Sequence, residues 1–108
     1  MTTHITYATA KRLKEFCPEL PDPIVEEWYT FSGGRVNNPF RGKPPAYQLH
    51  DLLGRDFCEK MALKIEPLAT KGVVGFLIMH IAAKIFGAYF NGGLPAVEAE
   101  LCRMMEGR

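Results

Sequence analysis

The residues of this chain that could support nucleophilic catalysis lie between positions 50 and 58. His50 and Asp51 are adjacent, and Cys58 follows eight residues after His50. A thiol activated by an imidazole that a carboxylate orients can work as a hydrolase or transferase site. On a continuous helix, however, His50 and Cys58 would stand roughly two turns apart, too far for a hydrogen bond. Cys58 also follows Phe57, which favours a small buried core residue, so we expect no enzymatic activity.

Two further groups could hold a metal or a haem. His80 lies in an apolar stretch, but it has no second ligand three or four residues away, since Lys84 is cationic at neutral pH. Cys102, Met104 and Met105 resemble a soft-metal site, although methionine at helical spacing is more typical of core packing. We therefore predict no metal site and no cofactor.

The segment 33–46 is rich in glycine, proline and asparagine and predicts a loop of about fourteen residues, in which Val36 and Phe40 either pin the loop to the core or form a short strand edge. Loops of this length are often functional. The bases Arg35, Arg41 and Lys43 surround Phe40, a composition that can contact phosphates and stack a base. Nucleic-acid binding through this loop is therefore one alternative, weakened by the small number of bases.

Aromatic residues precede and follow the loop. Trp28 and Tyr29 are adjacent, so on a helix they cannot both face the interior, and we expect at least one of them to be exposed. Exposed Trp or Tyr beside Arg is enriched at protein–protein hot spots. The predicted partner-binding residues are Trp28, Tyr29, Arg35, Asn38, Phe40, Arg41 and Lys43.

The elements that would position these residues are helices. A first helix is predicted from near Thr6 until Pro18, and a second from the cap Asp22-Pro23 until Gly33-Gly34. One kinked helix or two short ones should cover 47–63, interrupted at Gly54. A long helix should end at 91–93, and a last one should carry Pro95 in its first turn.

The most apolar stretch is residues 72–90, within a helix predicted over 68–90. One side of this helix carries Val74, Ile78, Ile81 and Ile85, and a second side carries Phe76, Met79, Ala83, Phe86 and Phe90. A helix apolar on most of its circumference belongs in the middle of a bundle. A membrane-associated protein anchored by 72–90 is the alternative, opposed by the cost of placing His80 and Lys84 in lipid.

Composition sets the remaining expectations. With 108 residues, 47% apolar and a net charge of +1, the chain should form one soluble domain over 1–108, with no general affinity for nucleic acid or membranes. Three widely spaced cysteines, and a start without an apolar signal segment, predict reduced thiols and a cytoplasmic location.

The sequence therefore predicts an all-α domain of about five helices around the central 68–90 helix, with one long loop over 33–46. The protein is expected to be a small non-enzymatic adaptor that binds another protein. The sequence also leaves open that the chain forms a homodimer. By analogy it resembles the accessory or inhibitor proteins that phages and mobile elements encode.

Overall fold

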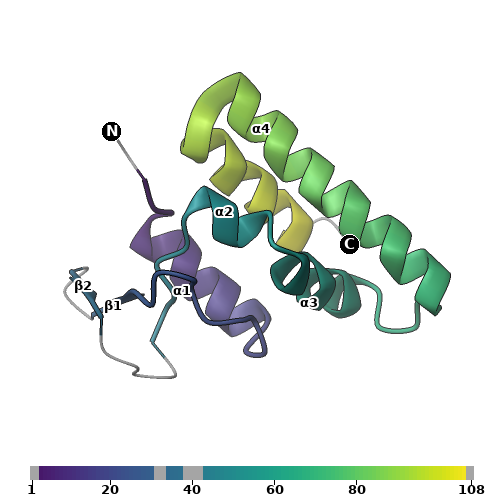
Figure 1. The fold of residues 1–108 in the computed structure, drawn as a ribbon, viewed down its shortest axis with the longest axis horizontal. Helices are drawn as coiled ribbons and strands as arrows, with labels where there is room; N and C mark the ends of the chain where they lie inside the picture. The colour runs from purple at the N-terminus through teal and green to yellow at the C-terminus, as the bar shows by residue number, and fades with distance from the viewer. Residues whose placement is uncertain (1–2, 31–33, 38–42, 107–108) are drawn as a thin grey trace.

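The computed structural model describes residues 3–30, 34–37 and 43–106. These residues form four helices and one small antiparallel sheet (Figure 1). The elements, in chain order, are α1 (Tyr7–Phe16), β1 (Trp28–Tyr29), β2 (Arg35–Val36), α2 (Leu49–Leu52), α3 (Arg55–Ile65) and α4 (Lys71–Glu106). The all-α class is thus broadly correct, whereas the five-helix bundle is not confirmed.

Helix α1 begins and ends where local signals predict. The hydroxyl of Thr6 accepts a hydrogen bond from the Thr9 backbone N–H at 3.4 Å, which satisfies one of the free donors of the first turn. Cys17 caps the other end directly before Pro18, which cannot continue a helix. Leu13 faces the core and is fully buried.

The region 47–63 forms two short helices rather than one. Gly54 is extended (φ −66°, ψ 147°) and serves as the N-cap of α3, so the predicted interruption is confirmed. Asp51 in α2 closes a capping box, its carboxylate accepting the Gln48 backbone N–H at 2.8 Å. The two helices bury Leu52, Phe57 and Met61.

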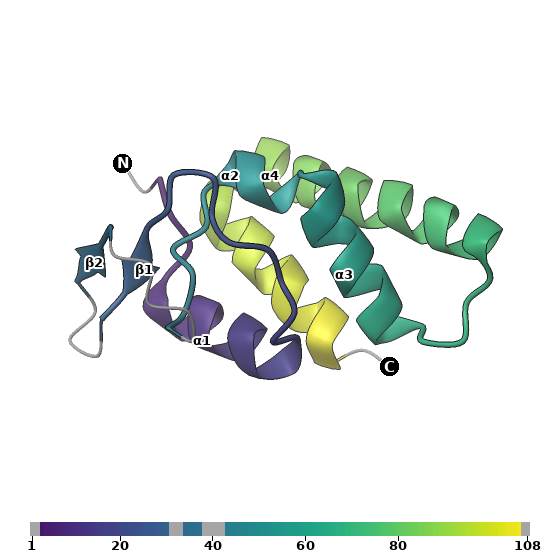
Figure 2. The same cartoon turned by 60° about the horizontal axis from the view of Figure 1, so that its bottom comes forward.

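Helix α4 reverses direction at Gly93. The backbone there has φ 70° and ψ −163°, a conformation essentially restricted to glycine. We call residues 71–92 the first arm and residues 94–106 the second arm. The second arm folds back beside the first and lies between it and α1 (Figures 1 and 2). The predicted break at 91–93, followed by Pro95, is therefore correct.

The helix predicted from Asp22-Pro23 to Gly33-Gly34 is wrong. Glu26 has a positive φ of 51°, which ends any helix after a single turn. Trp28 and Tyr29 instead form β1, which pairs with β2 on one side. On the other side Tyr29 N–H donates to Pro44 O at 2.8 Å, and Ala46 N–H donates to Glu27 O at 3.0 Å. The backbone hydrogen bonds of β1 with β2 and with residues 44–46 thus outweigh the favourable helix start at Asp22-Pro23.

The predicted loop over 33–46 is correspondingly reduced. Residues 35–36 are strand β2, and residues 44–46 run along β1. The tip of the predicted loop, 38–42, lies outside the described residues.

The core does not surround the apolar helix. Buried side chains of α1, α2, α3 and the second arm form one cluster, and the first arm joins it on one side only, where Ile81 and Ile85 are 3% and 0% exposed. The first arm runs along the outer edge of the molecule in both views (Figures 1 and 2). The prediction of a central 68–90 helix wrapped by its own chain is therefore wrong, because residues 22–30, which the structure describes, provide no covering helix.

One carboxylate joins the start of the chain to the second arm. Glu98 accepts hydrogen bonds from the Thr6 backbone N–H at 3.1 Å and the Thr6 hydroxyl at 2.6 Å, and also from the Thr9 hydroxyl. Its negative charge lies at the N-terminus of α1, where the helix dipole favours an anion. Glu98 therefore helps to hold α1 against α4.

We predict that Glu98→Ala lowers the free energy of unfolding by about 1–3 kcal/mol, because three donors lose a charged acceptor. Urea unfolding followed by circular dichroism measures the change. The matched control is Glu106→Ala, which removes only an exposed ion pair with Arg12 (3.3 Å) and should change stability by less than about 0.5 kcal/mol. Equal effects of the two substitutions would show that the Glu98 contacts do not stabilise the fold.

Candidate functional site

The outer side of the first arm exposes large apolar side chains. Phe76 is 79% exposed, Met79 73%, Phe86 57% and Phe90 82%. They share one side of the helix with two small residues, and we call the six positions the outer stripe: Gly72, Phe76, Met79, Ala83, Phe86 and Phe90. Soluble monomers rarely expose a contiguous apolar patch of this kind unless it binds something.

The position of the outer stripe follows from the packing of the opposite side. Leu77 and Ile81 line a small cavity of about 160 Å³ together with Ala62, Ile65 and Met104, which come from α3 and the second arm. Because an α-helix has only one side toward a given neighbour, this packing turns the outer stripe away from the core. By length and composition α4 could cross a membrane, and with only 11% of its most apolar window buried it differs from the mostly buried core helix that passes the same test.

Polar groups border the outer stripe. His80 lines an open apolar groove of about 500 Å³ together with Thr70, Gly72, Val73, Phe76 and Leu77. Lys84 reaches across to the second arm, where its Nζ lies 3.6 Å from Glu100 Oε1. Hydrogen bonding from Arg103, with a further contribution from Lys84, holds the pKa of Glu100 below its ordinary value.

Trp28 and Tyr29 do not form an exposed aromatic patch. They are 4% and 6% exposed, so the prediction that one of them reaches solvent is wrong. The Tyr29 hydroxyl donates to the Ile5 carbonyl, and its ring meets Tyr7 edge-on at 5.7 Å between centroids. Neighbouring strand residues point to opposite sides, and here both sides of β1 are covered.

The charged residues of the predicted loop are only partly described. Arg35 is exposed, but its Nε lies 3.4 Å from Glu27 Oε2, so its charge is already partnered. Lys43 is half-buried. The remaining predicted partner-binding residues, Asn38, Phe40 and Arg41, lie outside the described residues.

A polar cluster surrounds His4. His4 is 7% exposed, and its Nε2 is 3.1 Å from Glu27 Oε1 and 3.3 Å from Gln48 Nε2. The backbones of His4 and Gln48 also form a bridge. Thr3 Oγ1 lies 2.7 Å from His4 Nδ1, on the other side of the imidazole ring. Together these contacts tie the N-terminal segment to the segment before β1 and to the start of α2.

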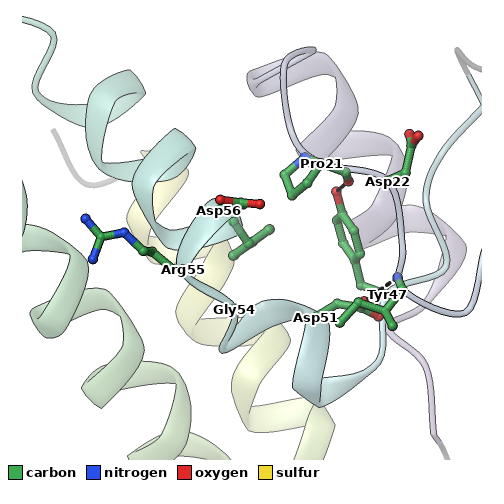
Figure 3. Close-up of a pocket in the computed structure, with 9 residues that line it drawn as sticks. Pro21, Asp22, Tyr47, Asp51, Gly54, Arg55 and Asp56 are labelled. Carbon is green, nitrogen blue, oxygen red and sulfur yellow. Dashed lines mark hydrogen bonds between the residues drawn. The ribbon is translucent and has the colours of Figure 1, made fainter.

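An acidic cavity of about 200 Å³ opens between α2, α3 and the Pro21 to Ile24 turn (Figure 3). Asp51, at its base, is already engaged, because its oxygens accept the backbone N–H groups of Ile24 at 2.7 Å and Gln48 at 2.8 Å. Figure 3 shows Arg55 pointing away from Asp51. In the part of the chain that the structure describes, no three His, Cys, Asp or Glu side chains come together as metal ligands.

The two buried cysteines, Cys17 and Cys58, are unsuited to nucleophilic chemistry. Cys58 is 1% exposed, its thiol donates to the Leu52 carbonyl at 3.4 Å, and burial raises its pKa to about 11. His50, in contrast, is exposed. Burial also raises the pKa of Cys17. The structure therefore does not assemble His50, Asp51 and Cys58 into a nucleophilic site.

Comparison of the chain with protein-family models, with curated proteins and with solved structures finds no match. The exposure of its large apolar side chains makes the outer stripe the candidate functional site. In the sequence, its aromatic residues were recognisable only as one of two apolar sides of a helix.

We predict that the three thiols of the native protein react at very different rates. Cys58 and Cys17 should be slow, because each is buried and its pKa is raised, whereas Cys102 is only half-buried. Brief alkylation at pH 7.5, followed by peptide mass spectrometry, should label Cys102 first, and Cys102→Ser should remove the fast phase. Rapid labelling of Cys58 in the folded protein would contradict its burial.

We further predict that Glu100 contributes to loss of stability in acid. A carboxylate whose pKa is lowered on folding stabilises the protein above its unfolded pKa, and that contribution is lost as the pH falls below about 4.5. Urea midpoints measured from pH 7 to pH 3 should therefore fall less steeply in Glu100→Gln than in the wild type. Parallel curves would show that Glu100 makes no such contribution.

Proposed function

We propose that this chain is a small non-enzymatic protein that binds another protein through the outer stripe of α4. The observation that carries the proposal is the exposure of Phe76, Met79, Phe86 and Phe90 on one helical side. Aromatic residues and methionine are enriched at the centres of protein interfaces, and an apolar helical side is typically buried against a second helix. This differs from the sequence-based proposal only in the surface used.

A membrane-associated role is the second candidate, favoured by the length and apolar composition of α4. Crossing a bilayer would require the first arm to leave the core, exposing Ile81 and Ile85 and breaking the contact of Lys84 with Glu100. Lying flat on a bilayer would keep these contacts. The first arm offers only Lys71 and Lys84 to anionic lipid, however, which gives weak electrostatic attraction.

Nucleic-acid binding through 33–46 receives less support from the geometry. Arg35 is paired with Glu27, and the chain carries a net charge of only +1. The loop residues can still form a secondary contact at a protein interface. A cytoplasmic location is part of the proposal and is supported by the three free cysteines.

We predict that a photo-crosslinking amino acid placed on the outer stripe captures protein. With p-benzoylphenylalanine in place of Met79, irradiation of cells of the native host should give protein adducts, resolved by gel electrophoresis and identified by mass spectrometry. The same amino acid in place of Lys11, which is exposed on α1, serves as the matched control and should give few adducts.

The double variant Phe76→Gln, Phe86→Gln should keep its helical circular dichroism, because both side chains are exposed, and should lose the Met79 adducts. Adducts with lipid alone, or co-flotation of the purified wild type with phosphatidylcholine vesicles, would overturn the proposal in favour of the membrane role.

A further inference from the structure

The outer stripe has the spacing of a helix that pairs with another helix. Successive members, from Gly72 to Phe90, are separated by four, three, four, three and four residues. This is the a/d repeat of coiled coils, in which apolar side chains from two helices interlock along a seam. The repeat extends along nearly the whole first arm, so an occupant of matching shape is a straight helix of similar length.

The stripe is complementary to itself when reversed. Positions at equal distances on either side of Ile81 along the chain form the pairs Gly72 with Phe90, Phe76 with Phe86, and Met79 with Ala83. In an antiparallel pair of first arms the two residues of each pair lie at the same level. A residue at heptad position a of one helix is then opposite a residue at heptad position d of the other. Each of the three pairs occurs twice in the dimer, so four levels combine a small with a large side chain and two levels combine two aromatic rings, an arrangement that favours close packing.

A parallel pair would not pack in this way. In that arrangement every residue meets its own copy, so Gly72 faces Gly72 and Ala83 faces Ala83, which leaves gaps, while Phe76 faces Phe76. The antiparallel pair also places the two helix dipoles in opposite directions, which is favourable.

The glycines of the first arm point to the same partner. A Cβ atom added to Gly72, Gly75 or Gly87 would meet no described atom within 4 Å, whereas one added to Gly92 would lie 2.9 Å from the Ala96 side chain. Glycine inside a helix is less stable than alanine, so contacts within the protomer give no reason for the first three. The close approach of a second helix backbone does give one.

The area and the charges also suit a second copy. The exposed parts of Phe76, Met79, Phe86 and Phe90 amount to roughly 600 Å² of surface, taking about 200 Å² for each large side chain. Two copies would thus cover about 1,200 Å², the lower limit of specific stable interfaces. No charged residue lies on the stripe, so pairing buries no charge.

We propose that two copies of this chain pair through their outer stripes, with the first arms antiparallel and a two-fold axis at the level of Ile81. The inference rests on the proposed function and narrows it, because the protein that the outer stripe binds is then a second copy of this chain, and a different partner binds there only in place of that copy. The interface is isologous, because each stripe contributes the same six residues, and it closes the assembly as a dimer.

The first test is the mass in solution. Sedimentation equilibrium without detergent should give twice the 12.1 kDa of the chain. Phe86→Glu places a charge in the seam and should raise the dissociation constant at least about 30-fold. The matched control, Leu63→Glu, introduces the same charge at an exposed leucine of α3 (38% exposed) and should leave the dimer intact. A wild type that remains monomeric at 100 µM (roughly the top of a useful affinity range) overturns the proposal.

The second test is the direction of the two arms. In a Cys102→Ser background, a mixture of Gly72→Cys and Phe90→Cys chains should form an interchain disulfide on mild oxidation. Phe90→Cys alone should form none, because in the antiparallel pair its two copies lie roughly 27 Å apart at 1.5 Å per residue. A disulfide in Phe90→Cys alone would indicate a parallel pair and overturn the proposed geometry.

The outcomes separate the two proposals. A monomeric wild type whose Met79 photo-crosslinker still captures another protein would overturn self-pairing and leave the protein-binding function standing. A monomeric wild type that captures only lipid would overturn both.

Discussion

The reversal of α4 at Gly93 determines how the rest of the molecule packs. With φ 70° and ψ −163°, Gly93 turns the chain so sharply that the second arm returns along the first. The return places Val97 and Leu101 in the core. It also brings Glu98 to the start of α1 and Glu100 to Lys84. Without that turn the two arms would form one rod, and α1 would lose its contacts with Glu98 and Glu106 of the second arm.

The same turn explains why one side of the first arm is left bare. A helix of this composition needs neighbours on most of its circumference, and the chain supplies them on one side only. The apolar residues of the N-terminal half are used elsewhere, since Trp28 and Tyr29 are buried in the small sheet and Leu13 is buried in α1. The exposed aromatics are therefore a consequence of how a short chain distributes its covering elements, and an interface is the physical solution that we propose.

Most of the helical boundaries could be predicted because their signals are local. Thr6, Gly54 and Gly93 each act on their own neighbours through a cap or a backbone angle. The segment 22–30 could not be predicted, because its structure depends on distant partners: Asp51 accepts the Ile24 N–H, and β1 pairs with β2 and with 44–46. The stripe itself was visible in the sequence. Which side of the helix faces solvent was not, since periodicity gives no information about the number of neighbours.

The glycines of the first arm have a consequence for the helix that carries them. Gly72 and Gly75 lie in its first turns, where backbone order is least favoured by the residues themselves and where Thr70, Lys71 and Phe76 are exposed. Few contacts within the chain hold these turns, since a Cβ atom added to Gly72 or Gly75 would meet no described atom within 4 Å. In the proposed dimer, occupation of the stripe and ordering of these turns are thermodynamically linked, so part of the association free energy is used to reduce helix fraying.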